Sequence, residues 1–511
     1  MSSRRGRAER DGTFAGSAPG RAIIDIGSNT VRMVVYGGSM RAPTVLLNEK
    51  VTAQLGRDIA KSGTLAEKAI DLAMLGLKRF ALLLQDLEID EVDVVATAAV
   101  RDASNSAAFV TKLEKLGLAP RILSGDEEAC ISAHGIAGAF PGSSGVVADL
   151  GGGSLELVTI ENGTPGKTIS LPLGTLRLPE YRGVKRKVMR KNLEKALDEG
   201  APDIEKGQPL YLVGGTLRTM AVYAMQEQGH PLSDPHGFEL DPGEATRLIG
   251  KALASETVET LQSRDRISSM RADKLPDASV LAEAMLSRFE PSRIIFSSWG
   301  LREGLIYDAL PEHERAQDPL IAGVSTFATQ RGAPPVLATR IAGWIVEAAP
   351  SGEHGSERVR LAAVMLALAS MQIEPNIRLP QAIDWALHKR WIAVSEAERA
   401  MIAAAIAANG NVMNLPNSVT SLASKEALDE AMSWGLAVRL ARRLGARSPR
   451  SLQVSRLSVE EDQLVLRLAD SHAALFGIPT EKDINLLANK RGLDWKLEIV
   501  TDEELNGAHT V

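Results

Sequence analysis

The feature that most constrains this chain is a strand–turn–strand pattern that occurs twice. RAIIDIGSNTVRMVVY (21–36) has two apolar runs joined by Gly-Ser-Asn-Thr, and GVVADLGGGSLELVTIENG (145–163) repeats that layout around three glycines. Apolar runs separated by small turn residues are typical of paired strands. Asp25 and Asp149 end the first strand of each copy. The pattern predicts an internal duplication with long divergence. Because strands alternate with helical segments, we expect an α/β fold with ligands at the strand ends.

The spacing of apolar residues along the rest of the chain predicts its division into domains. A chain of 511 residues is too long for one compact core. Residues 319–445 are Ala-rich with helical spacing, and a small α+β unit follows. The segments we expect are a disordered tail (1–20), half-domain I (21–143), half-domain II (144–313), a helical domain (314–447) and the α+β unit (448–511).

Composition excludes several classes of protein. Cys130 is the only cysteine and has no partner within the chain, so a reducing compartment is the natural expectation. No apolar run is long enough to span a membrane, and the N-terminal segment lacks the apolar core of a signal peptide. The net charge of -6 does not suggest a nucleic-acid partner. We therefore expect a cytoplasmic protein without membrane or nucleic-acid binding.

The two repeated turns are candidate phosphate-binding sites. Glycine lets an anion approach the backbone, whose N–H groups, with nearby hydroxyls, hold phosphate oxygens. Asp149 and Glu156 flank the second turn, and their carboxylates suit Mg²⁺. The alternative is a pair of plain hairpins with solvated acids. The candidate phosphate-binding residues of the turns are Asp25, Gly27, Ser28, Asn29, Thr30, Gly151, Gly152, Gly153 and Ser154.

Two further segments offer an anion site and a proton acceptor. Gly214-Gly215-Thr216 leads from a strand into a helix, which places helix N–H groups at the turn, although an ordinary capped helix start is as plausible. Ser124-Gly125-Asp126-Glu127-Glu128 connects the two halves. Acids in a first helical turn are usually caps and dipole partners. A carboxylate that faces the cleft would instead accept a proton from an attacking water.

Basic residues suggest where a polyanion would be held. Arg101 follows the predicted buried strand 92–98, a position suited to bidentate phosphate binding, with a surface arginine as the equal alternative. A basic cluster on a predicted helix is a possible polyphosphate path, although a solvated helix face is at least as plausible. The cluster includes Lys185, Arg186, Lys187 and Arg190.

Taken together, these segments resemble the exopolyphosphatase / guanosine pentaphosphate phosphatase family of the actin–sugar kinase–heat-shock superfamily. The resemblance covers about residues 21–310 and rests on six motifs in the family's order. They are AIIDIGSNTVRM, ATAAVRDASN, SGDEEA, VADLGGGSLEL, VGGTLRTMA and GLREGLIYD. The resemblance implies two RNase-H-like (actin-like) half-domains around a cleft. It also implies release of terminal orthophosphate from inorganic polyphosphate, or conversion of guanosine pentaphosphate to the tetraphosphate at the same site.

The resemblance also implies roles for individual residues. The catalytic base falls on Glu128, with Glu127 next in register. The metal carboxylates fall on Asp149 and Glu156, and the phosphate-binding arginine on Arg101. A Mg²⁺ ion would neutralise the phosphates while water attacks in line.

The C-terminal helical region resembles the family's HD-like domain more loosely. Leu366 and Ala367 stand about where a His-Asp pair would fall, so we expect this domain to be structural, closing a channel or forming a homodimer. Other functions stay open: a guanosine pentaphosphate hydrolase with little polyphosphate activity, a sugar or acid kinase, and a non-catalytic polyphosphate-binding protein.

Overall fold

The computed structural model describes residues 19–183, 185–201, 203–446 and 448–507. The tail predicted over residues 1–20 therefore lies almost wholly outside the described residues, and its last two residues belong to the first strand. The chain divides into two compact units, Met1–Pro319 and Leu320–Val511. Within the described residues, no helix combines the length and apolar character that crossing a bilayer requires.

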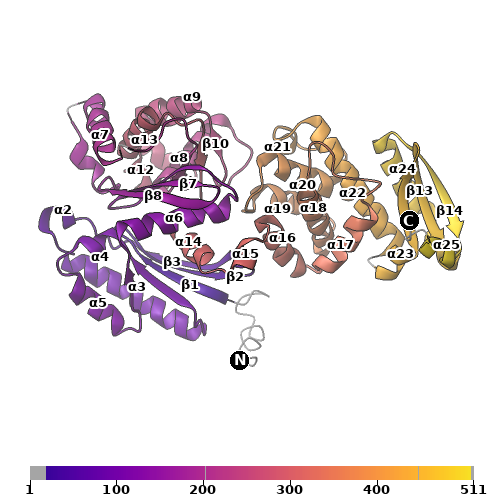
Figure 1. The fold of residues 1–511 in the computed structure, drawn as a ribbon, viewed down its shortest axis with the longest axis horizontal. Helices are drawn as coiled ribbons and strands as arrows, with labels where there is room; N and C mark the ends of the chain where they lie inside the picture. Colours follow the sequence, from indigo (N-terminus) through magenta and orange to yellow (C-terminus); the bar gives the residue numbers. More distant parts are fainter. Residues whose placement is uncertain (1–18, 184, 202, 447, 508–511) are drawn as a thin grey trace. The chain divides into compact units, whose positions relative to one another are not determined.

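The first half of unit 1 is a five-stranded sheet with the order β3-β2-β1-β4-β5 (Figure 1). Strand β2 runs antiparallel to both β1 and β3, whereas β4 is parallel to β1 and β5 is parallel to β4. The strands are β1 (Pro19–Ile26), β2 (Val31–Gly37), β3 (Thr44–Val51), β4 (Val92–Ala96) and β5 (Arg121–Ile122).

Helices cover both faces of this sheet, which explains why the successive apolar residues Ala22, Ile23 and Ile24 of β1 are all buried. Ile24 and Ile26 join one core with Phe80 of α3, while Ile23 faces the opposite core with Leu305 of α14. The helices of this half are α2 (Ile59–Ser62), α3 (Glu67–Asp86), α4 (Ala98–Asp102), α5 (Ser106–Glu114) and α6 (Gly125–Ala139).

The second half repeats the topology of the first. Its six-stranded sheet has the order β10-β11-β9-β6-β7-β8. Strand β6 pairs antiparallel with β7, β7 pairs antiparallel with β8, and β9 is parallel to β6, as β4 is to β1. The predicted duplication is therefore confirmed. The strands are β6 (Gly145–Leu150), β7 (Leu155–Glu161), β8 (Thr164–Leu171), β9 (Leu210–Val213), β10 (Glu239–Leu240) and β11 (Ile294–Phe296).

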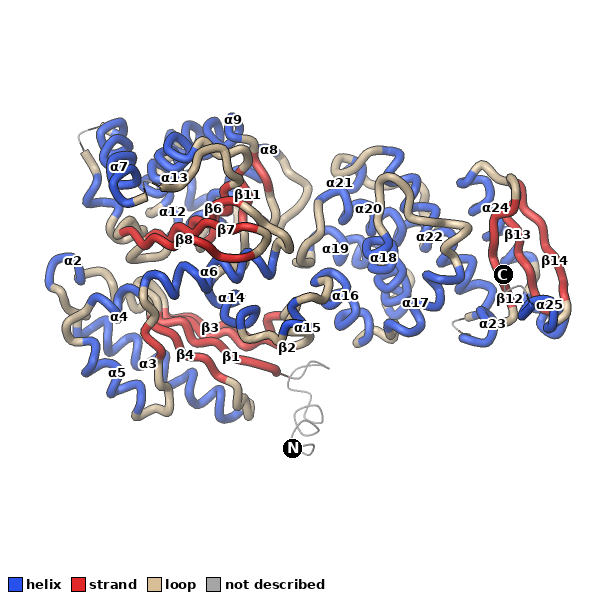
Figure 2. The backbone as a smooth tube through the Cα atoms, in the orientation of Figure 1, coloured by secondary structure: helices blue, strands red, loops and turns tan. Residues whose placement is uncertain are grey.

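Many short helices surround this second sheet, and the basic helix predicted near residues 185–206 is α7 (Figure 2). The longer ones are α7 (Arg186–Gly200), α8 (Gly215–Gln228), α13 (Leu275–Phe289) and α14 (Leu301–Asp308). The shorter ones are η1 (Leu178–Tyr181), α9 (Pro242–Ala245), η2 (Thr246–Ala252), α10 (Leu253–Ser255), α11 (Val258–Ser263), α12 (Ser269–Ala272) and α15 (Glu312–Arg315).

Helices α6 and α14 join the two halves by crossing at very close range. A Cβ on Gly304 would lie 1.8 Å from the carbonyl oxygen of Ile131, and one on Gly135 would lie 2.5 Å from that of Gly300. Only glycine allows the two helix backbones to approach so closely. Because α6 begins at the cleft with Glu128 in its first turn, this crossing also sets the position of that carboxyl group.

One predicted strand boundary is wrong. Strand β4 ends at Ala96, not at residue 98, because Ala96 pairs with Ile26, the last residue of β1. The chain then turns at Thr97 and forms α4, so Arg101 lies in a short helix and not at a strand end.

Unit 2 begins with a bundle of helices packed through small residues. A Cβ on Gly435 of α22 would lie 2.1 Å from the carbonyl oxygen of Ala405 in α20. The helices are α16 (Pro319–Thr329), α17 (Pro335–Trp344), α18 (Glu357–Ala369), η3 (Ser370–Gln372), α19 (Arg378–His388), α20 (Glu396–Asn409), α21 (Asn417–Thr420), α22 (Lys425–Gly445) and α23 (Pro449–Gln453).

The C-terminal part of unit 2 is a three-stranded sheet with helices, in the order β12-β13-β14. Strand β12 pairs antiparallel with β13, and β14 runs parallel to β13. Its elements are β12 (Ser455–Glu460), β13 (Gln463–Ala469), η4 (Asp470–Leu475), α24 (Ile478–Arg491), β14 (Asp494–Val500) and α25 (Asp502–Gly507).

The α6–α14 crossing generates a stability prediction. Gly304→Ala places a methyl group against the Ile131 carbonyl, so we expect the free energy of unfolding of unit 1 to fall by about 1–3 kcal/mol or more. Chemical denaturation followed by circular dichroism measures this change. Gly250→Ala is the matched control, because the nearest atom to its Cβ is 3.7 Å away. Equal loss in both variants would contradict this account of the crossing.

Candidate functional site

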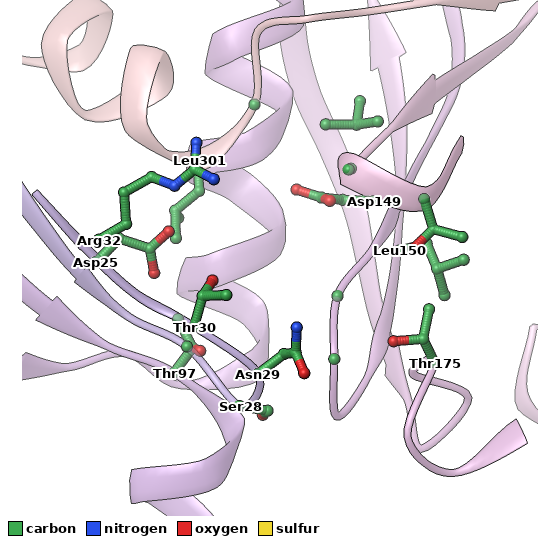
Figure 3. Close-up of a pocket in the computed structure, with 18 of the residues that line it drawn as sticks. Asp25, Ser28, Asn29, Thr30, Arg32, Thr97, Asp149, Leu150, Thr175 and Leu301 are labelled. Carbon is green, nitrogen blue, oxygen red and sulfur yellow. The ribbon is translucent and has the colours of Figure 1, made fainter. Parts of the chain in front are cut away.

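The candidate site is a cleft in unit 1 between the two sheets, with a volume of about 340 Å³. Both repeated turns line it, as do the start of α6 and the start of α8. Figure 3 shows Asp25 and Arg32 on one wall and Asp149 on the other. The structure therefore brings together most of the residues that the sequence singled out.

The two turns have the same local geometry. The Gly27 N–H donates to the Thr30 carbonyl at 3.0 Å, and the Gly151 N–H donates to the Ser154 carbonyl at 3.0 Å. Each turn closes a hairpin whose first strand carries the aspartate. Duplication thus extends to the hydrogen bonds of the cleft.

The glycines of the second turn are needed for a reason that the sequence did not reveal. A Cβ on Gly152 would lie 3.0 Å from the Ser28 Cβ, and one on Gly153 would lie 2.8 Å from the Ser28 Oγ. A Cβ on Gly174 would lie 2.3 Å from the backbone of Gly153. The two turns therefore approach each other, and the glycines make room for this approach as well as for any ligand.

Strand register places the two predicted metal carboxylates side by side. Asp149 and Glu156 are directly opposite each other in the β6–β7 pair, so both side chains project from the same face of the sheet. Ser132 Oγ donates to Asp149 Oδ2 at 2.5 Å, and Ser170 Oγ donates to Glu156 Oε1 at 3.1 Å.

The first hairpin has a cation where the second hairpin has its second carboxylate. Arg32 lies opposite Asp25 in the β1–β2 pair, at the position that Glu156 holds opposite Asp149. Burial raises the pKa of Asp25, and Arg302, 4.0 Å away, opposes that rise. One copy of the hairpin thus offers two carboxylates and the other a carboxylate with a cation. The sequence analysis missed Arg32, although the alignment of residues 25–32 with 149–156 would have found it.

Glu128 is a buried acid of the cleft whose pKa lies near neutrality. Its side chain is largely buried, and burial raises its pKa to about 7, with the charges of Asp149 and Asp25 adding to the rise. Arg101 opposes this, because its Nη1 donates to Glu128 Oε2 at 3.1 Å. A carboxyl group with a pKa near neutrality is suited to accept a proton.

The neighbouring Glu127 has a different position and contacts. Ser124 Oγ accepts from the Glu127 N–H at 3.2 Å, and Glu127 Oε2 accepts from the Ser124 N–H at 2.8 Å. This reciprocal pair is a capping box at the start of α6. The capping alternative therefore describes Glu127, while Glu128 lies in the cleft.

The segment Gly214-Gly215-Thr216 forms a helix start without a side-chain cap. Gly214 is the N-cap of α8 and has φ of 108°, a region that favours glycine, and glycine has no side chain that could cap the helix. Gly214, Gly215 and Thr216 line the cleft. Free N–H groups at a helix start attract an anion through their partial positive charge.

Several cations of the cleft were not assigned from the sequence. Burial lowers the pKa of Arg271 and of Lys274, which shows that these charged groups are poorly solvated. Arg302 lies in the motif GLREGLIYD and Arg218 in the motif VGGTLRTMA, so these motifs could have identified both arginines as candidate site residues. The basic residues lining the cleft are Arg32, Lys50, Arg218, Arg271, Lys274 and Arg302.

Two sets of predicted basic residues lie elsewhere. Arg101 is behind Glu128 and donates also to the Leu123 carbonyl at 2.9 Å, and it does not line the cleft. On α7, Arg186 and Arg190 both contact Glu283, at 3.1 and 3.0 Å. Lys185 and Lys187 are exposed near them. These four do not line the cleft, so a polyphosphate path along them stays a prediction.

The donor set of the cleft fits a divalent cation bound through few protein ligands. Burial raises the pKa of Asp149, and burial together with the charge of Glu128 raises that of Glu156 well above its usual value. A bound cation would reduce the electrostatic repulsion between these neighbouring carboxylates. No group of three or more His, Cys, Asp or Glu residues among those described could hold a metal by itself. Mg²⁺ ordinarily uses one or two carboxylates with water and substrate phosphates.

Comparison with known proteins decides the family. The model of the Ppx/GppA phosphatase family matches residues 34–313. This chain belongs to the Ppx/GppA phosphatase family. The two half-domains have the actin-like arrangement that the sequence predicted.

Individual relatives agree with this assignment. Exopolyphosphatase 1 of Mycobacterium leprae (strain TN) is 26% identical over 298 residues, which are 56% of this chain and 87% of that protein. The crystal structure of an exopolyphosphatase from Cytophaga hutchinsonii is 25% identical with a TM-score of 0.51, covering 56% of this chain and 96% of that one. The Aquifex aeolicus family member is 26% identical with a TM-score of 0.49, over 56% and 96%.

The Arg101–Glu128 contact generates a titration prediction. In metal-free protein, we expect one carboxyl group to titrate near pH 7 and to disappear in Glu128→Gln. Arg101→Met should move that titration to higher pH, because the hydrogen bond and charge of Arg101 lower the Glu128 pKa. Difference infrared spectroscopy across pH measures the protonated carboxyl.

Arg177→Met is the control for this titration. Arg177 Nη2 donates to Asp102 Oδ2 at 2.8 Å and forms no salt bridge with Glu128. An unchanged titration in Arg101→Met, or an equal shift in Arg177→Met, would contradict the assignment.

Proposed function

We propose that this member of the family is an exopolyphosphatase that releases terminal orthophosphate from inorganic polyphosphate. The observation that carries the proposal is Glu128, a buried carboxyl group with a pKa of about 7 in a cleft lined by cations and by N–H-rich turns. Relatives named as exopolyphosphatases support this substrate over others.

The proposed chemistry is a direct in-line displacement. The oxygen of a water molecule attacks the terminal phosphorus, and the bond from that phosphorus to its bridging oxygen breaks. Glu128 accepts the proton of the water, and the shortened chain leaves with the bridging oxygen. Phosphoryl transfer depends on positioning and charge stabilisation more than on covalent help.

Other residues of the cleft hold the substrate in this scheme. The turns at residues 27–30 and 151–154 and the start of α8 direct N–H groups and hydroxyls to the phosphates. Arg32 and Arg302 add positive charge beside Asp25. Arg101 acts through Glu128, holding its carboxylate and favouring the ionised form.

A Mg²⁺ ion would be held by Asp149 and Glu156, the opposed pair of the β6–β7 hairpin. When bound, Mg²⁺ neutralises phosphate charge and screens the crowded carboxylates. Ser132 and Ser170 orient the two carboxylates through their hydroxyl groups.

For the helical domain we propose a structural role, with an HD-like ancestry and no second hydrolytic centre. Leu366 and Ala367 are fully buried apolar residues of α18, in the segment where the His-Asp pair was sought. We further propose a cytoplasmic homodimer.

Neutralising the proposed base provides the first functional test. Glu128→Gln removes the proton acceptor but keeps the shape, so we expect kcat on polyphosphate to fall about 10²–10⁴-fold with little change in substrate affinity. Phosphate release and equilibrium binding measure the two quantities. Glu127→Gln is the matched control, since that side chain only caps α6, and its turnover should stay near normal. Wild-type turnover in Glu128→Gln would remove Glu128 from this role.

Substrate and metal dependence provide the second test. We expect phosphate release from polyphosphate of defined length without any nucleotide or acceptor, and loss of release with chelator. Asp149→Asn and Glu156→Gln should raise the Mg²⁺ concentration needed for half-maximal rate, because each variant loses a charged ligand. Faster hydrolysis of guanosine pentaphosphate than of polyphosphate would instead favour the nucleotide phosphatase, which uses the same site. An acceptor requirement would indicate a kinase.

A further inference from the structure

A second pocket lies within unit 2, along helix α17 and the turn that follows it (Figure 2). Its volume is about 510 Å³, and it shares no lining residue with the cleft of unit 1. One wall is formed by Arg340, Gly343, Trp344 and Glu347, whose spacing of i, i+3, i+4 and i+7 places them along one side of the helix. The other walls come from α23 and β12, through Pro449, Leu452, Gln453, Ser455, Arg456 and Leu457.

Gly343 leaves space in this pocket. Glycine inside a helix is less favourable than alanine, so it usually serves a packing need. Gly304 and Gly435 serve such a need, because the backbone of another helix lies against each of them. A Cβ on Gly343, in contrast, would meet no neighbouring atom within 4 Å among the described residues. The glycine therefore keeps open a space that any larger side chain would occupy.

Two side-chain contacts hold the walls of the pocket together. Trp344 is only 8% exposed, and its Nε1 donates to Ser455 Oγ at 3.0 Å and to the Ser455 carbonyl at 3.3 Å. Arg456 Nη2 donates to Glu347 Oε1 at 3.2 Å. Both contacts join the α17 segment to β12. The pocket is therefore formed before any ligand binds.

Arg340 gives the pocket a net positive charge. Arg456 and Glu347 compensate each other, whereas the Arg340 guanidinium forms no hydrogen bond or ion pair with any other described residue. No further acid is among the described residues that line the pocket. Leu452 and Leu457 contribute apolar surface beside these charges. One free cation next to apolar surface is suited to a ligand with one anionic group and an apolar body.

We propose that this pocket binds a small organic acid, whose anionic group pairs with Arg340 and whose apolar body fills the space beside Gly343. A guanidinium group binds a carboxylate or a similar oxyanion through two parallel hydrogen bonds. Pockets for small organic ligands are typically about 300–1,000 Å³ and combine apolar walls with a few polar groups. An inorganic phosphate chain has no apolar body, so this ligand differs in class from the substrate proposed for the cleft.

A matched pair of fluorescent probes tests the ligand class without using phosphatase activity. Anilinonaphthalene sulfonate carries one anionic group, and phenylnaphthylamine has the same ring system without it. We expect the full-length protein to bind the sulfonate saturably, with a dissociation constant of about 10–100 µM. The neutral amine should bind about tenfold more weakly, because it lacks the contact with Arg340.

Filling the pocket is the first arm of the experiment. Gly343→Phe places a ring in the open space, so binding of both probes at this site should be lost. Val336→Phe is the matched control, because Val336 lies on the same helix, is 64% exposed and does not line the pocket. This control should bind the sulfonate as wild type does. Circular dichroism and thermal unfolding of each variant verify that the fold is intact.

Removing the cation is the second arm. Arg340→Met keeps the length of the side chain but not its charge, so affinity for the sulfonate should fall about tenfold while affinity for the neutral amine stays the same. A defect in folding would weaken both probes alike. Arg450→Met, which removes an exposed cation of α23 that does not line the pocket, should change neither affinity.

Several results would overturn the proposal. They are a wild type that does not bind the sulfonate at about 100 µM, unchanged binding in Gly343→Phe, and equal loss of both probes in Arg340→Met. Inorganic tripolyphosphate provides a further check, because it competes only for a site that recognises phosphate chains. Displacement of the sulfonate by tripolyphosphate would assign the probe to such a site and not to this pocket.

Discussion

The close crossing of α6 and α14 is the constraint on which the rest of unit 1 depends. Two glycines let the backbones of these helices touch, and no side chain separates them. Helix α6 packs on the second sheet, and α14 with Ile131 of α6 packs on the first. Glu128 is in the first turn of α6 and Arg302 is in the first turn of α14. The same crossing therefore brings a carboxyl group and a guanidinium group into the cleft.

Around that crossing, the duplicated hairpins provide two walls with different charge. The second hairpin opposes Asp149 with Glu156, and the first opposes Asp25 with Arg32. In the proposed scheme, a substrate with many negative charges would meet Arg32 of the first hairpin, and a divalent cation would meet the two carboxylates of the second. Divergence after duplication thus changed one residue of a cross-strand pair and left the turn geometry intact. Burial, with the charges of Asp149 and Asp25 adding to it, raises the Glu128 pKa to about 7, where the carboxyl group exchanges protons near neutrality.

Unit 2 packs its long helices closely through small residues but leaves one strand of its sheet partly exposed. Alanine and glycine let α20 and α22 approach closely, as at Gly435. The C-terminal sheet, in contrast, has an outer strand whose apolar residues stay half-exposed.

The sequence by itself determined the duplication, the strand–turn–strand units and the turn residues, because apolar periodicity and glycine placement are local properties. It also placed Glu128, Asp149 and Glu156 among the candidates. Only the tertiary structure separates Glu127, which caps α6, from Glu128, which lines the cleft, because the two acids are adjacent and alike in the sequence. Tertiary structure likewise moved Arg101 behind Glu128, revealed Arg32 through strand register, and showed that Gly152 and Gly153 make room for Ser28. These outcomes depend on contacts between residues far apart in the chain, and no local pattern encodes such contacts.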